Sequence, residues 1–106
     1  MDKNYQFFSK LNVNINKIIN EPARLKIMTI LYVVENAEFN YLLQETGLTK
    51  GNMSSHIAKL ELANYVRVNK DYVNKIPRTI IGITPSGRYE YEIYRKCMLK
   101  LLKIVT

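Results

Sequence analysis

The chain has 106 residues, of which 47 % are hydrophobic and 24 % charged, as is typical of one compact globular domain. No apolar run is long enough to span a bilayer and residues 1–10 lack the apolar core of a signal peptide, so a cytoplasmic protein is expected. A single cysteine and a single histidine exclude an internal disulfide and a thiolate metal cage, while the net charge of +7 favours a polyanionic partner.

The first predicted element is a helix over about residues 5–19. Its apolar side chains recur at spacings of three and four, which places them on one helical face. These side chains are Phe8, Leu11, Ile15 and Ile18. Three asparagines, Asn12, Asn14 and Asn16, lie between them and lower the helix propensity.

A second helix is predicted from Pro22 to about Glu35. Asn20 or Glu21 can accept hydrogen bonds from its free N–H groups, and proline suits a first helical turn. Apolar residues surround much of this helix, which predicts a position at the centre of the core. They are Leu25, Ile27, Met28, Ile30, Leu31 and Val34.

A brief third helix is expected after a short connection at residues 36–39. Asn40 can cap it, and it would run through Glu45. Gly47 then supplies the left-handed conformation that ends a helix.

A fourth helix is predicted over residues 49–63, with Thr49 as its cap. Asn64 can adopt the left-handed conformation at its end. Its inward stripe is formed by Met53, Ile57 and Leu60. Two helices joined by a short turn that contains glycine are typical of a helix-turn-helix.

The periodicity then changes from helical to extended. Residues 65–70 alternate between apolar and polar side chains, and residues 78–84 are rich in β-branched side chains. Residues 71–77 between them are polar and basic, and Pro77 must lie where no ladder hydrogen bond is needed. The pattern predicts a β-hairpin directly after the helix-turn-helix.

The last predicted element is a helix over residues 85–105, with Thr84 as its cap and Pro85 in its first turn. A short heptad seam repeats along it at three, four, three and four. The seam consists of Tyr91, Tyr94, Met98, Leu101 and Val105. It can pack on the first helix of its own chain or against a second subunit.

This order of elements resembles winged-helix transcription regulators of the MarR-like and ArsR-like superfamily. The run Glu21–Met28 resembles the helix that precedes their reading head, and Leu48–Leu60 resembles their turn and recognition helix, with a Ser-x-His pair. Lys75–Thr79 and Ile83–Arg88 are similar to the wing and to the entry of the final helix. The resemblance implies one domain over residues 1–106, mainly α with a small antiparallel β-hairpin. It would be a winged helix-turn-helix with extra N- and C-terminal helices.

The sequence departs from these families at two places. Asn64 stands where they usually have glycine, which is tolerable because asparagine accepts a positive φ. The paired cysteines of ArsR-like metal sensors are absent from the corresponding stretch, Phe39–Leu43, so metal sensing of that kind is not expected. Cys97, close to the seam, is interpreted as a buried inert thiol, with a one-cysteine redox sensor as the alternative.

The positive charge is concentrated around the predicted reading head. Residues 50–88 contain seven basic and two acidic side chains, whereas residues 1–49 contain five of each. Small polar side chains on the outward face of residues 49–63 would let this helix enter a major groove about 12 Å wide. Sequence-specific binding of double-stranded DNA is therefore the preferred function, and a protein-interaction module or a non-specific nucleic-acid-binding protein is the alternative.

These interpretations assign a role to named residues. The helix over residues 49–63 would lie in the major groove, and the wing, residues 70–78, on the backbone or in the minor groove. The predicted DNA contacts are Thr49, Lys50, Asn52, Ser54, Ser55, His56, Lys59, Lys70, Lys75, Arg78 and Arg88. The predicted homodimer interface consists of Phe8, Leu11, Ile15, Tyr91, Tyr94, Met98, Leu101 and Val105. No catalytic residue, metal or cofactor is predicted, since no nucleophile is paired with a base and no carboxylates are suitably spaced.

Overall fold

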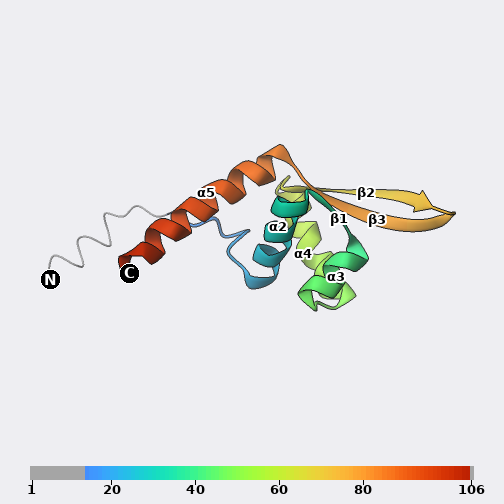
Figure 1. Cartoon of the computed structure of the whole chain (residues 1–106), viewed down its shortest axis with the longest axis horizontal. Helices are drawn as coiled ribbons and strands as arrows, with labels where there is room; N and C mark the ends of the chain where they lie inside the picture. Colours follow the sequence, from blue (N-terminus) through green and yellow to red (C-terminus); the bar gives the residue numbers. More distant parts are fainter. Residues whose placement is uncertain (1–13, 106) are drawn as a thin grey trace, which may run out of the picture.

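The structure of the protein is a computed structural model that describes residues 14–105 (Figure 1). Its elements are helix α2 (Pro22–Val34), strand β1 (Asn36–Glu38), helices α3 (Phe39–Thr46) and α4 (Lys50–Leu62), strands β2 (Val66–Val73) and β3 (Ile76–Ile83), helix α5 (Pro85–Leu102) and the short 3-10 helix η1 (Lys103–Val105). The hairpin of β2 and β3 extends to one side of the helical body, and α5 extends to the other (Figure 1). The predicted class, mainly helical with a small antiparallel sheet, is confirmed.

Side-chain caps fix where three of the helices begin. Glu21 Oε1 accepts a hydrogen bond from the backbone N–H of Arg24 at 2.8 Å, at the start of α2. Thr49 caps α4 and Thr84 caps α5 in the same way. A cap satisfies one of the N–H groups that the first helical turn leaves without a partner. These three starting points agree with the sequence-based prediction.

The segment before α2 is not the helix that the sequence predicts. Residues 14–20 form an irregular turn, and the remainder of the predicted helix, including Phe8 and Leu11, lies outside the described residues. Asn16 Oδ1 accepts hydrogen bonds from the backbone N–H groups of Ile18 at 2.9 Å and Ile19 at 3.1 Å. An asparagine that binds nearby N–H groups offers the backbone an alternative to the helix. The apolar spacing at this end of the predicted helix therefore reflects burial of a turn.

The sheet has three antiparallel strands in the order β1-β3-β2. β1 is an addition to the prediction, which placed a connection at residues 36–39, and α3 consequently begins at Phe39 without a side-chain cap. Three residues are too short a run for alternation to be recognised. β1 pairs with residues 80–82 of β3, where Gly82 leaves room for Asn36. A Cβ atom at Gly82 would lie 2.3 Å from Asn36 Oδ1.

The outer hairpin is longer and its turn is tighter than predicted. β2 and β3 pair from Val66 opposite Ile83 to Val73 opposite Ile76, so most of the predicted loop at residues 71–77 is strand. The two turn residues, Asn74 and Lys75, have φ angles of 52° and 65°. A two-residue turn with two positive φ angles matches the right-handed twist of the strands.

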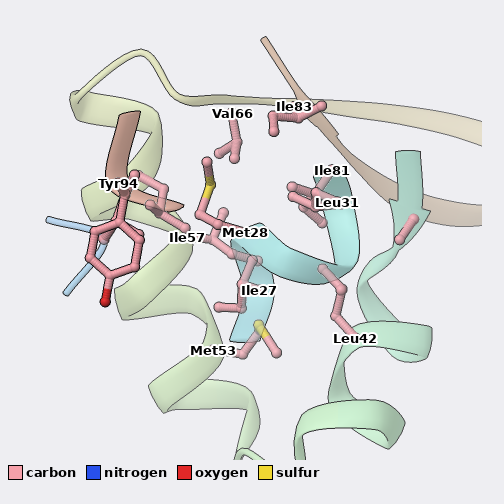
Figure 2. Packing of buried hydrophobic residues seen from close by; sticks show 13 residues of the cluster. Ile27, Met28, Leu31, Leu42, Met53, Ile57, Val66, Ile81, Ile83 and Tyr94 are labelled. Atoms are coloured by element: carbon pink, nitrogen blue, oxygen red, sulfur yellow. The ribbon is translucent and has the colours of Figure 1, made fainter. Parts of the chain in front are cut away.

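The core surrounds α2, as predicted for a helix that is apolar on most sides. Ile27, Met28 and Leu31 of this helix have no exposed surface. Side chains from α3, α4, β2, β3 and α5 converge on them (Figure 2). The converging residues are Leu42, Met53, Ile57, Leu60, Val66, Ile81, Ile83 and Tyr94. Because α4 packs on this core with one face only, its opposite face is left for another partner.

Gly87 sets how closely α5 approaches the beginning of the sheet. A Cβ atom at this position would lie 2.1 Å from the carbonyl oxygen of Tyr65. The same oxygen accepts a hydrogen bond from the N–H of Thr84 at 3.0 Å. The first turn of α5 is thereby held against the residue that precedes β2.

None of the helices over residues 14–105 combines the length and the apolar character of a membrane span.

Candidate nucleic-acid interface

From Thr49 to Lys59, the outward face of α4 is exposed and carries small or polar side chains. Met53, Ile57 and Leu60 are at most 6 % exposed and hold the helix on the core. The predicted contacts on the other side of the helix are all exposed: Thr49, Lys50, Asn52, Ser54, Ser55 and Lys59. The first turn of α4 contains no acidic residue. Because a helix N-terminus carries partial positive charge, this end of α4 favours an anion.

His56 differs from its neighbours because it points toward α2. Its Nδ1 atom lies 3.1 Å from Arg24 Nη1, and its Nε2 atom lies 3.9 Å from Glu21 Oε2. A guanidinium group only donates hydrogen bonds, so Nδ1 is the acceptor and the ring proton is on Nε2, facing the carboxylate. The side chain is 18 % exposed. This histidine connects α4 to α2, and both its nitrogen atoms, in a residue predicted to contact DNA, face protein groups.

Arg24 is a structural residue that the sequence analysis did not select. It is 9 % exposed, and its Nε donates a hydrogen bond of 2.6 Å to the carbonyl oxygen of Ile18. The hydrogen bond from the Arg24 backbone N–H is the main cause that lowers the pKa of the Glu21 carboxyl. In sequence this arginine resembles any exposed charge on a helix, since only the fold brings Ile18 and His56 to it.

Two of the predicted contacts on the hairpin of β2 and β3, Lys70 and Lys75, are exposed cations. Lys70 is paired with Thr79 across the hairpin. Lys70 and Thr79 line one side of a groove of about 350 Å³ between the hairpin and α4, and Ser54 of α4 lines the other side. The fold thus brings Ser54 and Lys70, two predicted contacts far apart in the sequence, to the same groove.

The arrangement matches a known family of DNA-binding proteins. The family described as winged helix DNA-binding domains matches residues 23–102. The chain belongs to this family. In the nomenclature of the winged-helix fold, α4 occupies the position called the recognition helix, and the hairpin of β2 and β3 occupies that of the wing.

Individual proteins are similar to this chain in sequence or in structure. An uncharacterized protein of Methanocaldococcus jannaschii is 40 % identical over 87 residues, which cover 82 % of this chain and 95 % of that protein. A transcriptional regulator homologue from Pyrococcus horikoshii has a similar structure, with a TM-score of 0.80, 27 % identity and 98 % of each chain covered. The fold is also similar to that of NadR, solved with 4-hydroxyphenylacetate, at a TM-score of 0.68 and 17 % identity, with 95 % of this chain and 74 % of that one covered.

Arg78, a predicted contact in the wing, is bound to two carboxylates of its own chain. Its Nε and Nη2 atoms donate to Asp71 at 2.6 and 3.1 Å, and its Nη1 donates to Glu38 at 2.8 Å. These hydrogen bonds lower the pKa of the Asp71 carboxyl and raise that of the guanidinium. The side chain is 39 % exposed, and each of its three guanidinium nitrogen atoms donates to a carboxylate of the protein.

Arg88, the predicted contact at the start of α5, packs against α2. Its guanidinium carbon lies 4.8 Å from the centre of the Tyr32 ring, and its Nη1 donates to the carbonyl oxygen of Tyr32 at 3.3 Å. A cation over an aromatic face is attracted by the ring quadrupole. The structure therefore associates Arg88 with the end of α2, apart from the groove between the wing and the recognition helix.

The predicted dimer residues divide into two groups. Tyr91 and Tyr94 pack within their own chain, the first stacked on Tyr32 with ring centres 4.7 Å apart. The second is 5 % exposed and donates a hydrogen bond to Asn20. Ile15 and Met98 are half-buried and pack against the same core. Farther along the seam, Leu101 is half-buried and Val105, in η1, is exposed. Ile93, Leu99 and Leu102 are further exposed apolar residues of α5 that the heptad spacing did not select.

Proposed function

We propose that this protein is a transcriptional regulator that binds double-stranded DNA sequence-specifically, with α4 in the major groove and the wing on the backbone or in the minor groove. One observation carries the proposal. From Thr49 to Lys59, the outward face of α4 is exposed and consists of small and basic side chains, while its opposite face is held in the core. Small polar side chains let the helix backbone lie deep in a major groove and can themselves hydrogen-bond to base edges.

Each proposed contact has a defined role. Asn52 and Ser55 have short side chains and would hydrogen-bond to base edges. The cations are better suited to phosphate, because a lysine is a compact charge on a flexible stem. The phosphate contacts would be Lys50 and Lys59 on the helix and Lys70 and Lys75 on the wing, assisted by Thr49 and Ser54. His56 and Arg88 would act through packing, because their polar atoms face protein groups.

The protein would act as a homodimer through the C-terminal part of α5. This part of the helix runs beyond α2 and α4 (Figure 1), and it carries the exposed residues Leu99 and Leu102. A two-fold dimer would present two recognition helices to major grooves about 34 Å apart. Sedimentation equilibrium of the Leu101→Lys variant tests this, with Val33→Lys on α2 as the matched control. A wild-type monomer at micromolar concentration would refute the dimer.

The decisive experiment for the function is selection of bound fragments from random duplex DNA. We expect enrichment of a palindrome whose half-sites are one helical turn apart. The Asn52→Ala variant should lose this enrichment, whereas Asn14→Ala, an exposed asparagine on the segment before α2, should retain it. Binding without any enriched motif would instead support non-specific nucleic-acid binding, and no binding would support a protein-interaction module.

A further inference from the structure

The outer part of the wing lacks the support that its base receives. β1 pairs only with residues 80–82 of β3, so from Thr79 outward the wing is a ribbon of two strands. This ribbon projects from the body (Figure 1). A hairpin of two strands is only marginally stable in water by itself. The orientation of the wing relative to α4 therefore needs an additional constraint at the edge of the three-stranded base.

Arg78 is at that edge and connects all three strands. It lies on β3 two residues outward from Ile80, which is paired with Glu38 of β1. Its guanidinium binds Asp71, its cross-strand partner on β2, through two nitrogen atoms, and Glu38 through the third. A bidentate arginine–carboxylate pair fixes direction as well as distance. Since Glu38 immediately precedes α3, the ribbon is tied to the start of the helix-turn-helix.

The charge of this cluster is opposite to that of a phosphate-binding site. Two carboxylates and one guanidinium give a net charge of −1, and every nitrogen of the guanidinium already donates to a carboxylate oxygen. A phosphate that approached would meet a cation whose charge is outweighed by the two carboxylates bound to it. The cluster attracts no polyanion by itself.

We propose that Arg78 is a positioning residue that holds the wing at a fixed angle to the recognition helix through Glu38 and Asp71, and that it makes no contact with DNA. This inference rests on the proposed DNA-binding function. It predicts that neutralising either carboxylate changes the affinity for DNA in the direction opposite to that expected from charge alone. We call the cluster of Glu38, Asp71 and Arg78 the brace. Removal of a negative charge near DNA should strengthen DNA binding, but loss of the brace should weaken it.

The test measures the affinity of purified full-length variants for one duplex at several salt concentrations. Glu38→Gln and Asp71→Asn should each weaken binding, by about three- to tenfold. Glu61→Gln, which removes a negative charge from the exposed face of α4, should leave affinity equal or stronger. Arg78→Ala should weaken binding without changing the salt slope, whereas loss of a phosphate contact would reduce that slope by about one. Tighter binding by Glu38→Gln and Asp71→Asn, or a shallower slope for Arg78→Ala, would overturn the proposal.

Hydrogen exchange of the free protein keeps the brace testable without DNA. Amides of β2 and β3 beyond Lys70 and Thr79 should exchange faster in Arg78→Ala and Glu38→Gln, and those of α2 should be unchanged. If the wild-type protein bound no duplex but this acceleration were observed, the proposed function would fail and the brace would stand. Unchanged exchange in the outer wing of both variants would refute the brace whatever the DNA result.

Discussion

The recognition helix and the wing both present basic residues, but they hold them differently. On α4, Lys50 and Lys59 are exposed, and within residues 14–105 neither forms an ion pair. In the wing, Lys70 and Lys75 are similarly exposed, whereas Arg78 is engaged by two carboxylates. The difference follows from side-chain chemistry, because a planar guanidinium can satisfy several protein acceptors at once and an ammonium remains a mobile point charge. Positive charge counted along the chain therefore overstates the charge that is available to DNA.

The largest expected effect is the salt dependence of DNA binding, which comes from the exposed lysines of both regions: Lys50 and Lys59 on α4, and Lys70 and Lys75 on the wing. Four lysines per subunit would neutralise about eight phosphates in a dimer, so affinity should fall by about 10³–10⁵-fold between 50 and 200 mM salt. A binding titration of one duplex at increasing salt measures this slope. The Lys70→Ala/Lys75→Ala double variant should show a clearly shallower slope than the wild type. A response that is independent of salt would contradict the phosphate contacts in both regions.

Gly→Ala substitutions at the base of the wing and on α4 should change the free energy of unfolding in opposite directions. At the base of the wing, Gly87→Ala would force a methyl group against the Tyr65 carbonyl and should lower the free energy of unfolding by about 2–4 kcal/mol. On α4, a Cβ atom at Gly51 meets no atom within 4 Å. Gly51→Ala should therefore stabilise the protein by about 0.5–1 kcal/mol, because alanine is the better helix former. Urea denaturation of both variants checks the pair, and equal effects would mean that the close approach at Gly87 is not retained in solution.

A smaller effect on affinity distinguishes residues that read the base sequence from residues that bind phosphate. Asn52→Ala should cost about 1–3 kcal/mol on the selected duplex and much less on random DNA, because only the correct base completes its hydrogen bonds. Lys75→Ala should weaken both complexes almost equally and reduce the salt slope by about one. The measured quantity is the ratio of the two affinities at fixed salt. Loss of that ratio in Lys75→Ala but not in Asn52→Ala would reverse the roles of helix and wing.

The same two regions show how far the sequence predicts structure. The start and the buried stripe of α4 were predicted correctly because caps and periodicity are local signals carried by residues such as Thr49 and Ile57. The partners of His56 and Arg78 were not, since Arg24 and Glu38 are 32 and 40 residues away in the chain. β1 was missed for a related reason, as a strand of three residues is defined by its pairing with β3 rather than by its own pattern.

The smallest expected effect is an acid-dependent loosening of the wing that leaves α4 in place. The Arg78 guanidinium, chiefly by hydrogen bonding, lowers the pKa of Asp71 below its ordinary value of 3.8. A carboxyl with a lowered pKa in the folded state stabilises that state above its unfolded pKa, and loses this contribution as the pH falls through the folded value. NMR titration of the Asp71 carboxyl should therefore give a midpoint below 3.8 in the wild type and one close to 3.8 in Arg78→Ala. The exposed Lys50 and Lys59 side chains of α4 belong to no ion pair within residues 14–105, so the resonances of α4 should not follow the transition. The same midpoint in both proteins would show that Arg78 and Asp71 are not paired in solution, and the proposed distinction between a braced wing and an open recognition helix would then be wrong.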